Sequence, residues 1–165
     1  MNYDAANQKE TIMRSMSYTL LAAVLLLFST QVLAGNSTNE ERNKQNVVEF
    51  YNKAINDKDF EAAEKYIGDT YIQHNPIAAD GKEGLKNFLT FARENLPQYH
   101  SEIKKVFADG NYVILHVHAR RTPEDRGSAV MDIFRLDENG KVVEHWDVVQ
   151  EIPPPEQTNN DNTMF

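Results

Sequence analysis

The sequence contains no cysteine among its 165 residues, and its acidic side chains outnumber the basic ones by 25 to 17. Without cysteine the fold has no disulfide bonds, so its stability must come from a hydrophobic core. The net charge of -8 argues against nucleic-acid binding, which requires clustered Lys and Arg to displace counterions from phosphate. A glycine-rich phosphate-binding loop is also missing, which argues against the use of a nucleotide.

Long apolar runs are lacking too, and the strongest run, LLAAVLLLF, covers only residues 20–28. A membrane-spanning helix needs roughly 20 such residues. The run follows Arg14, and Val32 and Ala34 stand where a signal peptidase requires small side chains. We therefore expect residues 1–34 to be a cleaved signal peptide and the mature protein to be secreted or periplasmic, with no stable membrane span. An uncleaved N-terminal anchor is the alternative.

The rest of the chain is long enough for one domain, which we expect over residues 40–152, after a linker at 35–39 and before a disordered tail at 153–165. Apolar residues at helical spacing predict three helices before Pro97, and alternation with a period of two predicts four strands after it. Thr38 and Glu41 can form a capping box at the start of the first helix, whose apolar residues recur over 47–55. The other helices are expected near 59–67 and 80–96, a short extended piece at 71–73, and the strands at 101–108, 111–120, 128–136 and 141–150. Helices followed by an antiparallel meander are typical of an α+β fold. Helices against the concave side of a curved sheet would enclose a cone-shaped cavity.

Two segments place polar groups among apolar, strand-forming residues: YIQHNP at 71–76 and EHWDVVQ at 144–150. Burial of such groups is costly unless they are paired or used. The turn signals between the strands predict that Asp132 lies opposite both His118 and Asp147. One face of the sheet would then gather His116, His118, Asp132, Phe134, His145 and Asp147.

On this register the other face of the sheet is apolar, and a second subunit would cover it most simply, giving a homodimer. The alternative is that the apolar face is the core and that the histidines point to solvent. A register slip of one residue would exchange the two faces of a strand, so this choice depends on the turns.

These two segments, together with Asp80-Gly81, VMDIFR at 130–135 and GKVVEHWDV at 140–148, resemble the SnoaL-like group of the nuclear transport factor 2-like superfamily. The resemblance covers residues 40–152 and implies the cone-shaped fold. The group is named for polyketide cyclases, in which an aspartate on a late strand is the acid/base and a histidine lies beside it. By resemblance these roles fall to Asp132 and His118, and His74 or Asn75 lines the pocket.

One function that follows is acid/base chemistry without a cofactor, such as aldol condensation, cyclisation or isomerisation of a carbonyl substrate by a lyase or isomerase. Asp132 would be the base, His118 would orient it, and His74 would donate a hydrogen bond to the oxyanion. The other residues expected to contact the substrate are Asn75, His116, Phe134, His145 and Asp147. The resemblance leaves the substrate open, because His116 stands where the cyclases have an amide-type partner.

Two other classes of function remain open from the sequence. Neutral imidazoles at His74, His116, His118 and His145 suit a metal ion, with Asp132 or Asp147 as an oxygen ligand, although no short zinc signature is present. The domain could instead hold a small hydrophobic ligand without changing it, since one fold hosts many functions. In each case the expected partner is a small molecule or ion.

Overall fold

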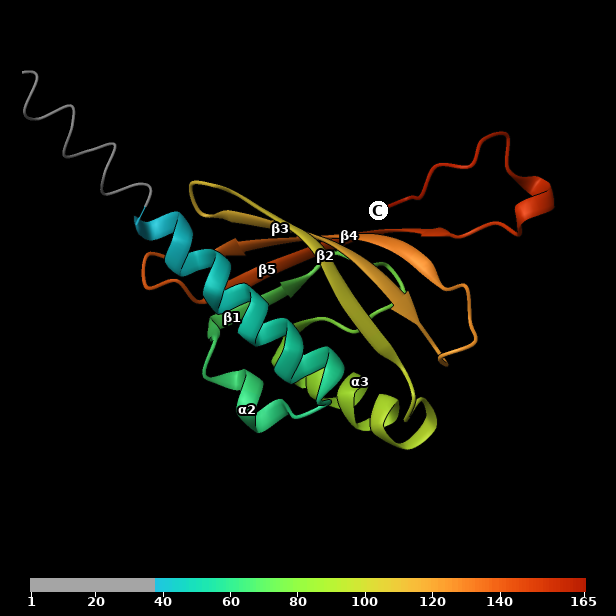
Figure 1. Cartoon of the computed structure of the whole chain (residues 1–165). Coiled ribbons are helices and arrows are strands. Elements are labelled where there is room, and N and C mark those ends of the chain that lie inside the picture. Colours follow the sequence, from blue (N-terminus) through green and yellow to red (C-terminus); the bar gives the residue numbers. More distant parts are fainter. Residues whose placement is uncertain (1–37) are drawn as a thin grey trace, which may run out of the picture. The chain divides into compact units, whose positions relative to one another are not determined.

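The computed structural model describes residues 38–165, and the expected signal peptide at 1–34 lies outside them (Figure 1). Residues 38 and 39, expected in the linker, are already helical. Among the described residues no helix has the length and apolar character that crossing a membrane requires.

Helices come first in the chain, as the apolar spacing predicts. Residues 38–51 are α-helical and continue into a π-helical turn, η1 (Asn52–Asn56). The short helix α2 (Phe60–Glu64) and the longer helix α3 (Gly81–Asn95) follow. Asp80 caps α3 and also accepts the backbone N–H of Gln73 at 2.8 Å, which ties the start of the helix to the end of the preceding strand.

That strand, β1 (Ile67–Gln73), is longer than the predicted extended piece and begins where the second helix was expected to end. It pairs in parallel with β5 (Val142–Glu151) at the edge of the sheet. Gly68 permits this approach, because a Cβ at this position would lie 2.6 Å from Cγ1 of Val143. The close strand contact explains why the chain leaves the helix early.

The four predicted antiparallel strands are confirmed, with bounds within two residues of those expected. They are β2 (His100–Asp109), β3 (Tyr112–Arg120), β4 (Ser128–Leu136) and β5. The sheet has the order β1-β5-β4-β3-β2 and is mixed, because β1 adds to it in parallel. A bulge interrupts the β2–β3 pairing between Ile103 and Lys105.

The predicted register between β4 and β5 is confirmed, since Asp132 lies opposite Asp147 and Phe134 opposite His145. The predicted register between β3 and β4 is wrong. His118 faces Ala129 instead of Asp132, a shift of three residues, and Asp132 lies opposite Leu115. An odd shift moves the side chains of one strand to the other face.

The loop before β4 causes this shift. We expected a loop centred near Asp125, but the backbone N–H of Asp125 bonds to the carbonyl of Thr122 at 3.2 Å, so the turn lies earlier. The carboxylate of Asp125 then accepts the N–H of Gly127 at 3.0 Å, and Gly127 has a positive φ of 76°. These contacts place Ser128 opposite Ala119 at the start of β4.

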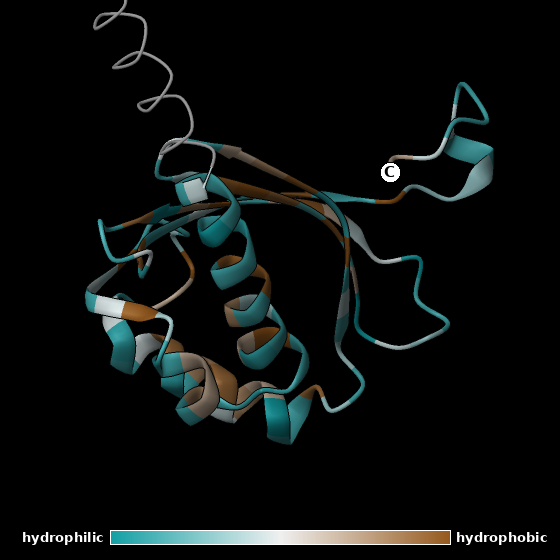
Figure 2. Ribbon diagram, turned by 60° about the vertical axis from the view of Figure 1, so that its left-hand side comes forward, coloured by the Kyte–Doolittle hydropathy of each residue, from teal (hydrophilic) through white to brown (hydrophobic). Residues whose placement is uncertain are grey.

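The helices cover the concave face of the curved sheet, and the core lies between the two layers (Figure 2). Val113, Leu115 and Val117 of β3 point into this core and are fully buried. For β3 the alternative interpretation therefore holds, with the apolar face inside. We call the opposite side of the sheet the outer face. It carries Ile114, His116, His118, Met131, Ile133, Trp146 and Val148.

The tail at 153–165, expected to be disordered, contains a short 3-10 helix, η2 (Pro155–Gln157). Phe165, the last residue of this tail, lies against the outer face, where its ring stacks on His118 with 4.6 Å between centroids.

Candidate functional site

A cavity of about 380 Å³ lies between the helices and the concave face of the sheet. Phe50 and Tyr51 of the first helical segment and Leu85 of α3 form part of its helical wall, whereas Val130 and Phe134 belong to the wall made by the sheet. Most of this lining is apolar or aromatic. Such a cavity with a few polar groups is the usual form of a small-molecule site.

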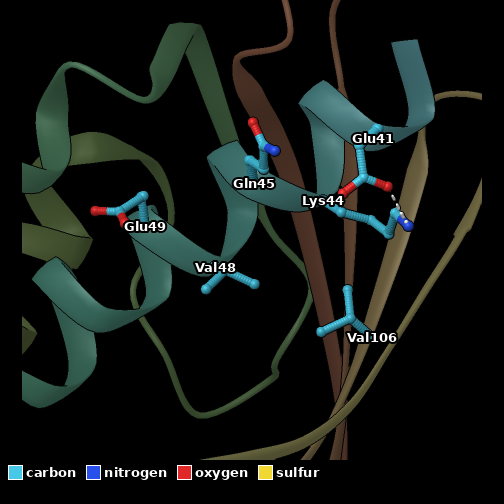
Figure 3. Close-up of a pocket in the computed structure, with 6 residues that line it drawn as sticks. All are labelled: Glu41, Lys44, Gln45, Val48, Glu49 and Val106. Carbon is cyan, nitrogen blue, oxygen red and sulfur yellow. Dashed lines mark ion pairs between the residues drawn. The ribbon is translucent and has the colours of Figure 1, made fainter. Parts of the chain in front are cut away.

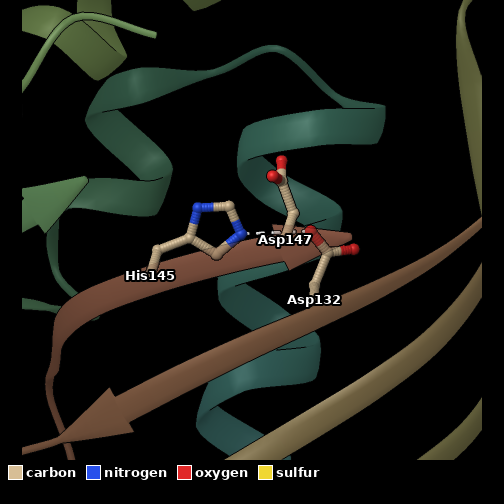
Figure 4. Close-up of side chains that lie close together, drawn as sticks. All are labelled: Asp132, His145 and Asp147. Atoms are coloured by element: carbon tan, nitrogen blue, oxygen red, sulfur yellow. Dashed lines mark hydrogen bonds and ion pairs between the residues drawn. The ribbon is translucent and has the colours of Figure 1, made fainter. Parts of the chain in front are cut away.

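Three polar groups of the cavity come from the neighbouring strands β4 and β5. Because Asp132 and Asp147 are directly opposite and His145 is two residues from Asp147, their side chains leave the same face of the sheet. His145 Nε2 lies 3.0 Å from Oδ1 of Asp132 (Figure 4). Ligand atoms of all three side chains lie within 4.8 Å of one another. We call Asp132, His145 and Asp147 the acidic cluster.

Gln73, at the end of β1, orients His145. Its Nε2 lies 3.0 Å from Nδ1 of the imidazole, whereas its Oε1 lies at 3.2 Å and already accepts the backbone N–H of Asn75 at 2.9 Å. We therefore assign Nδ1 as the acceptor from Gln73 and Nε2–H as the donor to Asp132. This tautomer gives the Asp132 carboxylate a fixed hydrogen bond from inside the cavity wall.

Asn75 holds the second carboxylate. Its Nδ2 donates to both oxygens of Asp147, at 2.8 and 2.9 Å, and its Oδ1 accepts the backbone N–H of Ile77 at 3.0 Å. The parallel strand β1 thus supplies one amide for the imidazole and another for the carboxylate. A polar network in which the partners are satisfied is rigid.

One atom of the acidic cluster has no partner. Asp132 is only 5% exposed, and its Oδ2 makes no hydrogen bond with any described residue. Leaving a buried carboxylate oxygen unpaired costs free energy, so such an atom requires an explanation. An oxygen that is kept free for a proton or donor group of a bound molecule provides one.

Three phenol groups also line the cavity. Burial raises the pKa of the Tyr51 and Tyr71 hydroxyls, and the negative charge of Asp132 raises both further. Both hydroxyls therefore stay protonated at neutral pH and can donate hydrogen bonds. Tyr99 also lines the cavity, and its pKa is raised mainly by burial.

The structure brings together some of the predicted site residues and separates others. Asp132, Asn75, Phe134, His145 and Asp147 line the cavity as expected. The predicted pairing of His118 with Asp132 is wrong, because the register of β3 turns His118 to the outer face, where its Nε2 lies 2.7 Å from the carbonyl of Arg126. His145 takes the place beside Asp132 that we assigned to His118.

His116 and His74 also lie outside the cavity. His116 is on the outer face for the same reason as His118. The ring of His74 stacks on Trp146 with centroids 4.5 Å apart, and its Nε2 lies 2.8 Å from Glu144. The hydrogen bond from His74 lowers the pKa of Glu144. These histidines are therefore not positioned to donate to a molecule in the cavity.

We did not predict Gln73, Tyr51, Tyr71 or Tyr99 as site residues. A signal for two of them was present, because alternation places Tyr71, Gln73 and Asn75 on one face of the β1 segment and His74 on the other. The choice of His74 overlooked this alternation.

Only one of the four histidines in the metal hypothesis, His145, lies in the cavity. Among the described residues, the acidic cluster is the group that could hold a metal ion, with one imidazole and two carboxylates. A site with four histidines is therefore not formed.

A second hollow, of about 450 Å³, lies between the first helix and β2 (Figure 3). It is an open groove in which Lys44 and Glu41 form an ion pair at 2.6 Å, beside Val48 and Val106. These side chains do not converge on one point, and the acidic cluster is elsewhere.

The sequence matches the model of the SnoaL-like domain over residues 47–145, which is more than half of the chain. No curated protein matches the sequence.

Several solved structures have a similar fold. One is a protein from Kribbella flavida proposed to be a ketosteroid isomerase, with a TM-score of 0.60 and 13% identity over 76% of this chain and 94% of its own. Another is a SnoaL-like protein of unknown function from Burkholderia thailandensis, with a TM-score of 0.57 and 18% identity over 67% of this chain and 96% of its own. A third, from Bacillus cereus, is a proposed polyketide cyclase, with a TM-score of 0.56 and 22% identity over 66% of this chain and 74% of its own. At these identities the similarity shows the fold alone.

Proposed function

We propose, because this chain belongs to the SnoaL-like family, that it is an enzyme that moves protons on a small carbonyl compound bound in the cavity. The observation that carries this proposal is the unpaired Oδ2 of Asp132, a buried carboxylate oxygen with an imidazole fixing its other oxygen. Solved structures of the same fold include proteins proposed to be a polyketide cyclase and a ketosteroid isomerase, which supports a lyase or isomerase.

In the proposed reaction, Oδ2 of Asp132 takes a proton from the carbon next to the substrate carbonyl. The electron pair of that C–H bond moves to the carbonyl oxygen and forms an enolate. The hydroxyls of Tyr51 and Tyr71 are the protonated donors available to stabilise the negative oxygen. The enolate carbon then attacks a second carbonyl, whose oxygen takes the proton back from Asp132, as in an aldol condensation. Alternatively, the enolate regains the proton from Asp132 at another carbon, as in an isomerisation.

His145 and Gln73 act on Asp132 and not on the substrate. His145 donates to Oδ1, which holds the carboxylate plane and leaves Oδ2 as the proton acceptor. Gln73 keeps the hydrogen of the imidazole on Nε2. These roles need no cofactor.

Proton exchange tests the proposal without knowledge of the natural substrate. In D2O, the enzyme should replace α-protons of small ketones and 1,3-dicarbonyl compounds with deuterium faster than buffer does, as measured by ¹H NMR. A compound that binds without any catalysed exchange would instead identify a non-catalytic binding module for a small hydrophobic ligand.

We also propose that two copies associate through the outer face. Met131 and Val148 are neighbours across β4 and β5, and Val148 is 65% exposed although it is apolar. A single aspartate at either position should shift the protein toward a monomer in sedimentation velocity, because it would place a charge in an apolar interface. Phe91→Asp, a change at an exposed apolar residue of α3, is the control that should leave association unchanged. A wild-type protein that sediments as a monomer at high concentration contradicts the proposal.

Export is proposed from the apolar run at 20–28 and the small residues before position 35. The full chain, expressed in a bacterial host, should be recovered outside the cytoplasm with Gly35 as its first residue. Mass spectrometry of the intact protein measures this, and recovery of an unprocessed chain in the cytoplasm would contradict it.

A further inference from the structure

One positively charged side chain lines the cavity. Arg121, which follows the last residue of β3, is the only Lys or Arg among the described residues that line the cavity. Its guanidinium forms no ion pair or hydrogen bond with another described residue, and only its backbone N–H is bonded, to Asp125. By contrast, Arg135 pairs with Glu144, and Arg126 donates to the carbonyl of Ile152.

The backbone of Arg121 is held in place by the loop that follows it. Its N–H donates to Oδ2 of Asp125 at 3.2 Å, and Oδ1 of Asp125 accepts the N–H of Gly127 at 3.0 Å. These two backbone hydrogen bonds lower the pKa of Asp125 most, and the charges of Arg121 and Arg126 lower it further, so the carboxylate is ionised and bonded to the main chain. The guanidinium of Arg121 therefore lies in the field of Asp125 but forms no hydrogen bond or ion pair with it.

The distribution of charge around the cavity is uneven. The acidic cluster contributes two carboxylates, and Asp125 contributes a third, which is bonded to backbone N–H groups. Arg121 contributes the cation and is exposed to solvent. The Tyr99 hydroxyl lies within the field of both, because Asp132 and Asp147 raise its pKa whereas Arg121 lowers it. An anionic group would be repelled by the acidic cluster and attracted by the guanidinium, which favours an orientation with the anionic group at Arg121.

We propose that the substrate is an oxo acid, whose carboxylate is bound by Arg121 at the mouth of the cavity while its carbonyl end lies beside Asp132. This inference rests on the proposed function, since it names the substrate class for the same site. Arginine suits this role because its planar guanidinium binds a carboxylate through two parallel hydrogen bonds.

A matched pair of ligands tests this proposal: a 4-oxo acid of five carbons and its methyl ester. The two compounds have the same ketone and nearly the same size, but only the acid is charged. Titration calorimetry should give the wild-type protein about tenfold higher affinity for the acid. Arg121→Gln should remove most of this preference by weakening the binding of the acid.

Arg120→Gln is the control, because Arg120 is the adjacent residue, has the same charge and lies on the other face of β3. It should retain the preference for the acid. Equal affinity of the wild-type protein for acid and ester would overturn the proposal, and so would a preference that persists in Arg121→Gln. Absence of binding by both compounds would count against it as well.

The Asp132→Asn variant separates this inference from the proposed function. Suppose that Asp132→Asn retains the preference for the acid and that the wild-type protein exchanges no α-protons. Arg121 then has the assigned role, and the enzyme proposal is wrong. If exchange depends on Asp132 but the acid has no advantage over the ester, the enzyme proposal stands and the role of Arg121 does not.

Discussion

The Asp132→Asn variant is expected to catalyse α-proton exchange about 10²- to 10⁴-fold more slowly than the wild-type protein. Asparagine has nearly the same shape as aspartate, but its amide cannot accept the proton. His145 Nε2–H can still donate to the amide oxygen, which lies where Oδ1 of Asp132 is now. The fold should therefore persist while the base is lost, and the rate of deuterium incorporation by ¹H NMR measures the difference.

Asp109→Asn is the matched control for this variant. Asp109 is an exposed carboxylate at the end of β2, away from the cavity lining, and asparagine before Gly110 remains compatible with the hairpin turn. It should exchange protons at the wild-type rate. If Asp132→Asn also does so, Asp132 is not the base, and its unpaired oxygen has another cause.

Phe134→Ala is expected to lower the free energy of unfolding by about 3–5 kcal/mol. Phe134 is 2% exposed and joins the helices to the sheet through ring contacts. Its centroid lies 5.8 Å from that of Phe50, 6.4 Å from that of Tyr51 and 4.7 Å from that of His145. Truncation would leave a space that none of these rings can fill without moving. Urea unfolding followed by circular dichroism measures the loss.

Phe107→Ala removes the same group from an exposed position on β2 and should cost far less. Similar losses for both variants would mean that Phe134 does not join the two layers in solution. Phe134→Ala also tests the prediction that Phe134 contacts the substrate. A folded variant with unchanged ligand affinity would contradict that prediction.

The sequence predicts the strands of this fold well because their alternation and turn residues are local signals. The register of β4 and β5 was nevertheless correct for a partly wrong reason. We expected a two-residue turn with Glu138 opposite Lys141, but Asp137 donates its N–H to the carbonyl of Lys141 at 2.8 Å. A bulge between Arg135 and Leu136 then restores the expected pairing along the strands.

The site was harder to predict because it depends on contacts between distant segments. The side of β3 that faces the helices follows from where the chain turns between Thr122 and Asp125, and propensity does not specify this to the residue. The part played by Gln73 depends on the parallel pairing of β1 with β5, whose partners lie 72 positions apart. The two carboxylates and His145 needed only the β4–β5 hairpin, and their grouping was predicted.

The bulge in β2 has a consequence for how the molecule behaves in a crowded solution. In the described part of the chain β2 is an edge of the sheet, and a flat edge offers free backbone groups to strands of other molecules. Here the irregularity between Ile103 and Lys105 bends that edge, and the charged side chains of Glu102, Lys104 and Lys105 lie on it. Strand addition, the first step toward amyloid-like aggregates, is therefore disfavoured at the same edge where the sheet would otherwise be most open to it.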